Sequence, residues 1–183
     1  MKLKRYLLLV VFIISSFYLT GCLVGNKLSY KIVLESQNSG TAIIKYYYIR
    51  SDADTKDRLE EDKYLLYEYM AKSKQFVADM KKEGREIIDR KLYLDENGKL
   101  IAEGTYKFKS LNSVENLVYD NGYYFITLQL EDSVLSTNGQ VIRTANYKRI
   151  IWDEGYKTLE FEILTEPAPD NYIDMARYYK NYY

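Results

Sequence analysis

The sequence predicts an α+β fold, in which an antiparallel sheet of about seven strands packs on one long amphipathic helix, with a short helix and a C-terminal helix besides. Three observations support this prediction. Several segments alternate apolar and polar residues and are joined by turns rich in Asn and Gly, as antiparallel hairpins are. Residues 54–82 have helical periodicity instead. The order of strands and helices favours an antiparallel sheet over alternating βαβ units.

The first hairpin is predicted between residues 28 and 50. In "LSYKIVLES", one face of a strand carries Leu28, Tyr30, Ile32 and Leu34. The turn "QNSG" follows, because Asn and Gly tolerate positive φ. The segment "TAIIKYYYIR" then supplies the β-branched and aromatic residues of a returning strand.

One long helix is predicted next, with Asp54 or Thr55 as its N-cap and acidic residues in its first turns. Its apolar stripe repeats about every 3.6 residues. The stripe consists of Leu59, Leu66, Met70, Ser73, Val77 and Met80, flanked by Leu65, Tyr69 and Phe76. Two lysines and Gly84 provide the expected C-terminal end.

The strongest hairpin prediction follows, from "REIIDRKLYL" to "IAEGTYKFK", because Asn97-Gly98 suits a type I′ turn. "SLNSVENL" predicts a short helix capped by Ser110. Three more strands are predicted in "NGYYFITLQL", "GQVIRTANYKRIIW" and "YKTLEFEIL". The last segment, "PDNYIDMARYYKNYY", predicts a C-terminal helix capped by Asp170.

The N-terminus has the pattern of a secretory signal. Lys2, Lys4 and Arg5 precede an apolar run from Leu7 to Leu19. This run is too short for a membrane-spanning helix, which needs about 20 apolar residues. A charged start, a short apolar run and a small residue near a cleavage point are typical of a signal peptide.

The end of that run, "LTGC", resembles the lipobox of bacterial lipoproteins, and Cys22 is the only cysteine. The resemblance implies cleavage between Gly21 and Cys22 and attachment of lipid to the Cys22 sulfur. Such lipid chains anchor a protein to a membrane durably. Leu23 follows the cysteine, and by resemblance to enteric-type sorting this implies the outer membrane, or the outer face of the cell membrane where there is only one. The alternatives are an ordinary signal peptide or a membrane anchor, either with a chance cysteine.

The predicted organisation has four parts. Residues 1–21 are the lipoprotein signal peptide, and 22–27 are a short acylated tether. Residues 28–165 form a single α+β domain, and 166–183 are a tyrosine-rich tail or short helix. Only two prolines occur, both near the end, so no linker divides the domain.

The composition excludes several classes of function. The chain has 26 basic and 26 acidic residues, and three of the basic ones precede residue 22, so the remainder is slightly acidic. Nucleic-acid binding usually needs a clustered basic face, so we expect no nucleic-acid partner. The chain has no histidine, which is the most common general base and metal ligand. We therefore expect no metal, no cofactor and no catalytic residue.

The common catalytic and calcium motifs do not fit. Ser-His-Asp and Cys-His systems need histidine, and neither a serine–lysine spacing nor a phosphate-binding loop occurs. "SDADTKDRLEED" favours a helix start over an EF-hand loop, which needs glycine where Asp57 stands. A glycan-cleaving enzyme with two carboxylates is a third hypothesis without support from these residues.

Binding is the better-supported class. A sheet covered by one helix often encloses an apolar cavity between the two layers, and methionines adapt to irregular ligands. The candidate cavity residues are Leu66, Met70, Phe76, Val77, Met80, Tyr106 and Phe108. A solid core made of the same residues is the alternative.

The tail is the second candidate site. The chain has 21 tyrosines, and the tail places several on one side of its predicted helix. The candidate partner surface is Tyr172, Met175, Tyr179 and Tyr182. The alternatives are packing of these residues on their own domain, simple fraying of the tail, or a position at the membrane interface, where tyrosine is favoured.

The layout also resembles the LppM-type lipoproteins. The matching segments are "NSGT" at Asn38–Thr41 and "YKFKSLNSVENL" at Tyr106–Leu117, within residues 22–165. The resemblance implies an envelope domain with a cavity for a hydrophobic ligand. Members often carry a C-terminal membrane span, whereas this chain ends in the tyrosine-rich segment.

Together these patterns predict a membrane-tethered envelope lipoprotein that binds a lipid-like ligand or an envelope protein and catalyses no reaction. The second hypothesis is a structural or assembly lipoprotein that docks to an envelope complex through its tyrosine-rich tail.

Overall fold

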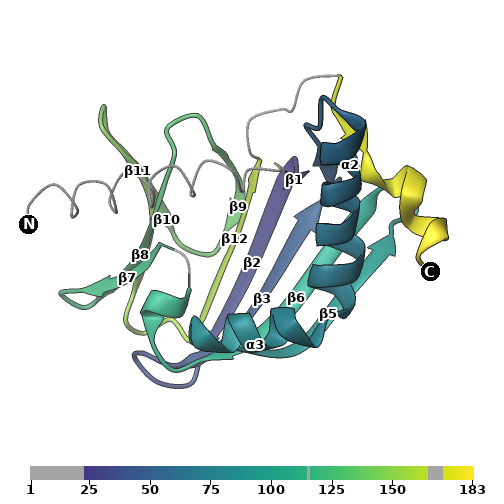
Figure 1. Cartoon of the computed structure of the whole chain (residues 1–183). Helices are drawn as coiled ribbons and strands as arrows, with labels where there is room; N and C mark the ends of the chain where they lie inside the picture. The colour runs from purple at the N-terminus through teal and green to yellow at the C-terminus, as the bar shows by residue number, and fades with distance from the viewer. Residues whose placement is uncertain (1–22, 115, 165–170) are drawn as a thin grey trace, which may run out of the picture.

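The computed structural model describes residues 23–114, 116–164 and 171–183. Its strands form three antiparallel sheets, and its helices are short (Figure 1). Strands take up 47% of the described residues and helices 23%. The predicted α+β fold, one sheet packed on one long helix, is therefore wrong: the protein is mainly β.

The largest sheet has six strands in the order β5-β6-β3-β2-β12-β9. Their bounds are β2 (Lys27–Leu34), β3 (Gly40–Tyr47), β5 (Arg85–Leu94), β6 (Leu100–Phe108), β9 (Ser133–Thr137) and β12 (Thr158–Leu164). β2 pairs with β3 and β5 with β6, so both predicted hairpins are confirmed. The predicted type I′ turn at Asn97-Gly98 is wrong, because Gly98 has positive φ (71°) and Asn97 does not. The alternating burial along β2 and β12 shows that one face of this sheet is covered.

A second sheet, of four strands, has the order β10-β11-β8-β7. It consists of β7 (Leu117–Asp120), β8 (Tyr123–Leu128), β10 (Gln140–Arg143) and β11 (Lys148–Asp153). The segment predicted as one strand over 139–152 is therefore a hairpin. Its turn forms because Thr144 Oγ1 accepts hydrogen bonds from the backbone N–H groups of Asn146 and Tyr147, at 3.2 and 3.1 Å.

The predicted long helix is broken. It consists of α2 (Lys56–Lys63), the π-helix η1 (Tyr64–Met70) and α3 (Lys74–Lys82). Thr55 caps α2, as one of the two predicted caps. The chain turns at Ser73, which is extended (φ −67°, ψ 134°) and caps α3 by accepting a hydrogen bond from Gln75 N–H. α2 and α3 therefore cross the sheet in different directions (Figure 1).

A third, small sheet joins both ends of the described chain. It has the order β1-β4-β13, with β1 (Leu23–Val24), β4 (Arg50–Ser51) and β13 (Ile173–Asp174). Part of the predicted tether is thus a strand. The 3₁₀ helix η3 (Met175–Asn181) follows β13 and is capped by Asp174, whereas the predicted cap Asp170 lies outside the described residues. Ser110 caps η2 (Leu111–Ser113), so the predicted cap is confirmed, but the predicted short helix is a single 3₁₀ turn and Leu117 begins β7.

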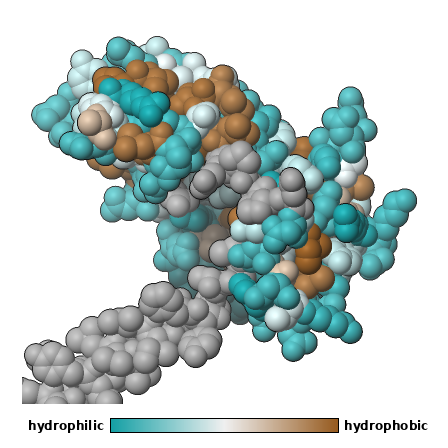
Figure 2. Space-filling model, turned by 90° about the horizontal axis from the view of Figure 1, so that it is seen from above, coloured by the Kyte–Doolittle hydropathy of each residue, from teal (hydrophilic) through white to brown (hydrophobic). Residues whose placement is uncertain are grey.

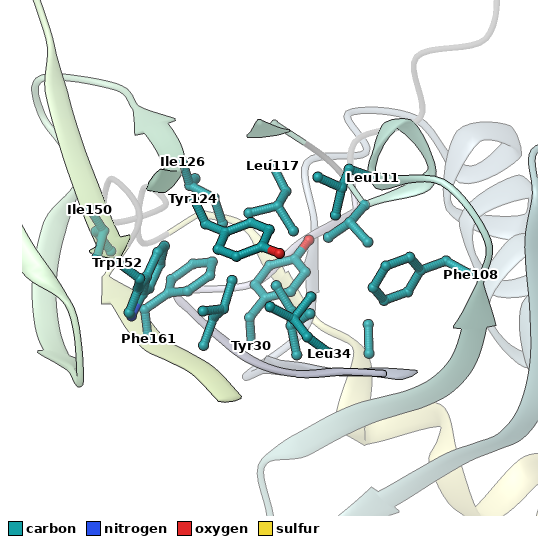
Figure 3. Close-up of a cluster of buried hydrophobic side chains, with 14 of the residues drawn as sticks. Tyr30, Leu34, Phe108, Leu111, Leu117, Tyr124, Ile126, Ile150, Trp152 and Phe161 are labelled. Atoms are coloured by element: carbon teal, nitrogen blue, oxygen red, sulfur yellow. The ribbon is translucent and has the colours of Figure 1, made fainter. Parts of the chain in front are cut away.

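Two hydrophobic clusters lie on the covered face of the large sheet. The first fills the space between the large sheet and the four-stranded sheet. Figure 3 shows Tyr124 and Ile126 of β8 facing Tyr30 of β2 and Phe161 of β12 across this cluster. The second cluster lies under α2 and η1 and includes Leu66, Tyr67, Leu92, Leu100 and Met175. One sheet face thus has two different covers, a sheet at one side and helices at the other.

Asp62 joins α2 to the small sheet. Its carboxylate is almost fully buried and accepts a hydrogen bond from Ser51 Oγ at 2.5 Å. Burial raises the pKa of Asp62 above its ordinary value of 3.8, although the Ser51 hydrogen bond opposes this shift.

A raised pKa in the folded state means that protonation favours folding, and this contribution is lost as the pH rises through that pKa. We therefore expect the wild type to gain stability relative to Asp62→Asn as the pH falls from about 7 to about 4. Urea unfolding of both proteins at several pH values measures this, with Asp57→Asn, exposed on the same helix, as the control. A constant difference between wild type and Asp62→Asn at all pH values would contradict the raised pKa.

Candidate functional site

A cavity of about 300 Å³ lies between the helices and the covered face of the large sheet. Most of its lining is apolar. The helices contribute Leu66, Met70, Ala71, Phe76 and Met80. Strands β2, β3, β5 and β6 form the opposite wall. The cavity therefore lies beside the two hydrophobic clusters and under the broken helix.

The strand register explains why the sheet wall is hollow. Paired residues of antiparallel strands project from the same face. Ile44 of β3, Gly104 of β6 and Arg90 of β5 form one such row. In the middle of this row Gly104 has no side chain, and a Cβ built there would have no atom within 4 Å. The missing side chain on β6, between β5 and β3, thus creates the space.

The break between η1 and α3 shapes the helix wall. Because the chain turns at Ser73, Met70 at the end of η1 and Phe76 on α3 both reach the cavity. The Phe76 ring packs edge-on against Tyr69, with ring centroids 5.6 Å apart. Met70 is partly exposed, so this wall borders solvent. Methionine side chains are flexible and adapt to irregular ligands, which suits a binding wall.

Two arginines are the charged side chains on the cavity face of the sheet. Arg90 donates from Nη1 to the carbonyl oxygen of Met70 at 2.8 Å, and its guanidinium lies 5.6 Å from the Phe76 ring centroid. Arg85 donates from Nε to the carbonyl oxygen of Ser113 at 2.8 Å. Both arginines are half-buried and line the cavity.

Lys91 and Glu103 also border the cavity, but they belong to a row that projects from the other face of the sheet. Lys45 completes that row and forms an ion pair with Glu103, with Nζ and Oε2 3.1 Å apart. The hydrogen bond to Glu103 raises the pKa of Lys45. The charge on the cavity face itself is therefore positive.

Five of the seven predicted cavity residues border this space: Leu66, Met70, Phe76, Met80 and Tyr106. Phe108 instead belongs to the first hydrophobic cluster, and Val77 is not part of the lining. The sequence analysis missed Gly104 and Arg90. A glycine inside a predicted strand was the available sign, because such glycines mark a bulge or a close approach of a ligand.

The tail packs on its own domain. Met175 is fully buried, and its carbonyl oxygen accepts a hydrogen bond from the hydroxyl of Tyr67. Tyr182 stacks on the Tyr67 ring with centroids 4.4 Å apart. Tyr179 donates from its hydroxyl to the carbonyl oxygen of Leu92 at 3.1 Å, and Tyr172 is half-buried. The candidate partner surface is thus largely an internal contact.

The four-stranded sheet also carries apolar residues at the surface. Val118, Tyr123 and Val141 are exposed, and Figure 2 shows hydrophobic and hydrophilic side chains side by side on the lobe that contains this sheet. Arg149 lies 4.5 Å from the ring centroids of both Phe125 and Tyr147. A charged side chain therefore lies beside aromatic ones on this sheet, whereas most of the cavity lining is apolar.

Some predicted features lie outside the described residues, Gly21 and Cys22 among them. The described residues form no helix that is long and apolar enough to cross a bilayer. They also contain no group of three or more His, Cys, Asp or Glu side chains placed to hold a metal ion.

No protein-family model, curated protein or solved structure matches the chain at a significant level. The resemblances to the lipobox and to the LppM-type lipoproteins rest on their sequence motifs alone.

Proposed function

We propose that this chain is a membrane-tethered envelope lipoprotein whose domain binds a small lipid-like ligand and catalyses no reaction. The observation that carries the proposal is the apolar cavity over Gly104. A glycine inside a strand weakens it, because it has no side chain to pack. An apolar side chain at this position would fill the space and support the strand. A glycine here therefore suits a cavity that is filled by a ligand.

The lining supports binding over catalysis. A general acid or base must lie within hydrogen-bond reach of the reacting group. Among the described lining residues the one carboxylate is Glu103, which projects from the other face and is paired with Lys45. Apolar walls with few polar groups are typical of ligand pockets.

The tether is proposed from the sequence. The lipobox-like end of the signal places the lipid on Cys22, and the membrane is then the first partner of the protein. The outer membrane is the proposed location in a cell with two membranes, and the outer face of the cell membrane in a cell with one. Because Met175 is buried and Tyr179 and Tyr182 contact their own domain, we do not carry the docking hypothesis further.

The most direct test is to fill the cavity. Gly104→Val is expected to lower the affinity for an apolar fluorescent fatty-acid probe at least tenfold. The melting temperature should not fall, since a β-branched residue suits a strand and meets open space here. The contacts described for the two hydrophobic clusters are all made by residues within 23–183, so this part of the chain keeps them and can be used without lipid.

Thr105→Val is the matched control, because Thr105 lies on the same strand and pairs with Ile43 on the other face. It should bind the probe as the wild type does. Native mass spectrometry of residues 23–183, purified without detergent, gives a second measurement, in which a retained lipid-sized mass supports the proposal. Equal binding by Gly104→Val and wild type would contradict it.

A further inference from the structure

We propose that the ligand is a single-chain amphiphile with an anionic head group, and that Arg90 binds this head group at the rim of the cavity. This inference rests on the proposed function and specifies its ligand. The apolar walls would hold the chain of the ligand, and the guanidinium would bind the head.

The charge distribution favours an anion. Arg85 and Arg90 both project from the cavity face of β5, since their partners in β6 are Phe108 and Gly104. Glu103, the one carboxylate among the described lining residues, belongs to the opposite face and already pairs with Lys45. A cationic head group would therefore meet two like charges, and a neutral one would gain no ionic contact.

Arg90 is held in a position suited to a head group. Its Nη1 donates to the carbonyl oxygen of Met70, at the last residue of η1, where helix carbonyls lack partners within the helix. Within the described residues this is the one hydrogen bond of its guanidinium, which has five N–H donors. The remaining donors can bind a carboxylate or phosphate, and the fixed side chain loses little freedom when they do.

Gly104 allows the head group and the acyl chain of the ligand to lie side by side. It is the partner of Arg90 in the register, so the hollow begins directly beside the arginine. Ile44 flanks the same glycine from β3 and continues the apolar wall. A ligand whose head contacts Arg90 therefore has its chain over Gly104.

The volume of the cavity limits the length of the ligand's acyl chain. At about 30 Å³ for a water-sized group, a cavity of about 300 Å³ has room for about ten groups. It is at the lower end of the range for ligand pockets. One acyl chain of about ten carbons fits this space, whereas two such chains do not.

The test is a displacement assay with four probes that share one chain of about ten carbons and differ in the head group: a carboxylate, a phosphate, an alcohol and an ammonium. Residues 23–183 are used with the fluorescent fatty-acid probe bound. We expect the carboxylate or the phosphate to bind at least tenfold more tightly than the alcohol, and the ammonium most weakly. The better of the two anions distinguishes a free fatty acid from a single-chain phospholipid.

Arg90→Gln is expected to lower the affinity for the better anion about tenfold and to leave the alcohol unchanged. The affinity of Arg90→Lys for this anion should lie between those of wild type and Arg90→Gln, because lysine keeps the charge but not the planar guanidinium. Lys107→Gln, at an exposed cation on the other face of β6 and outside the lining of the cavity, is the matched control and should bind as the wild type does. The head-group comparison on the wild type needs no variant and stands even if Arg90→Gln folds poorly.

The outcomes separate the two proposals. If the alcohol binds as tightly as both anions, the anionic head group is wrong, while the lipid-binding function stands. If no probe displaces the fluorescent fatty acid, or that probe does not bind, the proposed function itself fails. Retention of a two-chain phospholipid in the native mass spectrum would overturn the single-chain inference alone.

Discussion

Replacing Trp152 by alanine is expected to lower the free energy of unfolding by about 3–5 kcal/mol. The side chain is almost fully buried in the first hydrophobic cluster, with its ring centroid 6.1 Å from that of Phe161. Its Nε1 donates to Asn138 Oδ1 at 2.7 Å, and the same oxygen accepts the Glu160 backbone N–H at 2.8 Å. The substitution thus leaves both a large cavity and a weakened junction between the two sheets.

Urea unfolding followed by circular dichroism measures this loss. Tyr156→Ala is the control, because this tyrosine is exposed in the turn after the same strand and should change stability by less than about 0.5 kcal/mol. A loss below about 1 kcal/mol for Trp152→Ala would mean that the four-stranded sheet does not pack on the large sheet as described.

Tyr67→Ala is expected to have a similar effect on the second cluster, about 3–5 kcal/mol. Tyr67 is fully buried, stacks on Tyr182 and donates a hydrogen bond to the carbonyl oxygen of Met175. Burial raises the pKa of its hydroxyl strongly, so the group stays protonated and remains a donor at neutral pH. The alanine variant loses the packing and the attachment of the tail together.

Tyr67→Phe separates these two contributions. It keeps the ring and removes the hydroxyl, so we expect a loss of about 1–3 kcal/mol from the unsatisfied carbonyl of Met175. Limited proteolysis of the tail should become faster in both variants, more so in Tyr67→Ala. If the alanine variant keeps wild-type stability and a protected tail, the tail does not pack on this cluster.

Local patterns in the sequence predicted the local structure well. The hairpins β2–β3 and β5–β6 follow from strict alternation and from turns such as Asn97-Gly98, which depend on residues close in the chain. Thr55 and Ser110 are caps for the same reason, since a cap bonds to backbone two or three residues away.

The errors arose where one pattern fits two structures. Apolar residues keep the same helical spacing on both sides of Ser73, so one helix and two helices with a turn between them look alike. The polar Ser73 in the stripe was the one sign of the break. In 139–152, β-branched residues flank "TAN" on both sides, and the turn depends on the hydroxyl of Thr144. The number of sheets depends on contacts between distant segments, which single-sequence patterns do not contain.

The candidate site was predicted in part for a related reason. The methionines and Phe76 follow from helix periodicity, and the structure places them on the cavity wall. Arg90 and Gly104 are neighbours only because β5 and β6 pair in one register with a bulge at Ile87–Asp89. A shift by one residue would move Arg90 to the other face of the sheet.

The strand β1 has a mechanical consequence. Leu23 pairs directly with Ser51, and Ser51 donates to Asp62 in α2, which continues into η1 and the wall of the cavity. If Cys22 carries the proposed lipid, about one residue, or about 3.6 Å of chain, links the lipid to β1. The domain would then lie directly at the bilayer. A force on the anchor then acts on β4 and the helix wall. Extraction of the lipid and opening of the cavity would be coupled in this way.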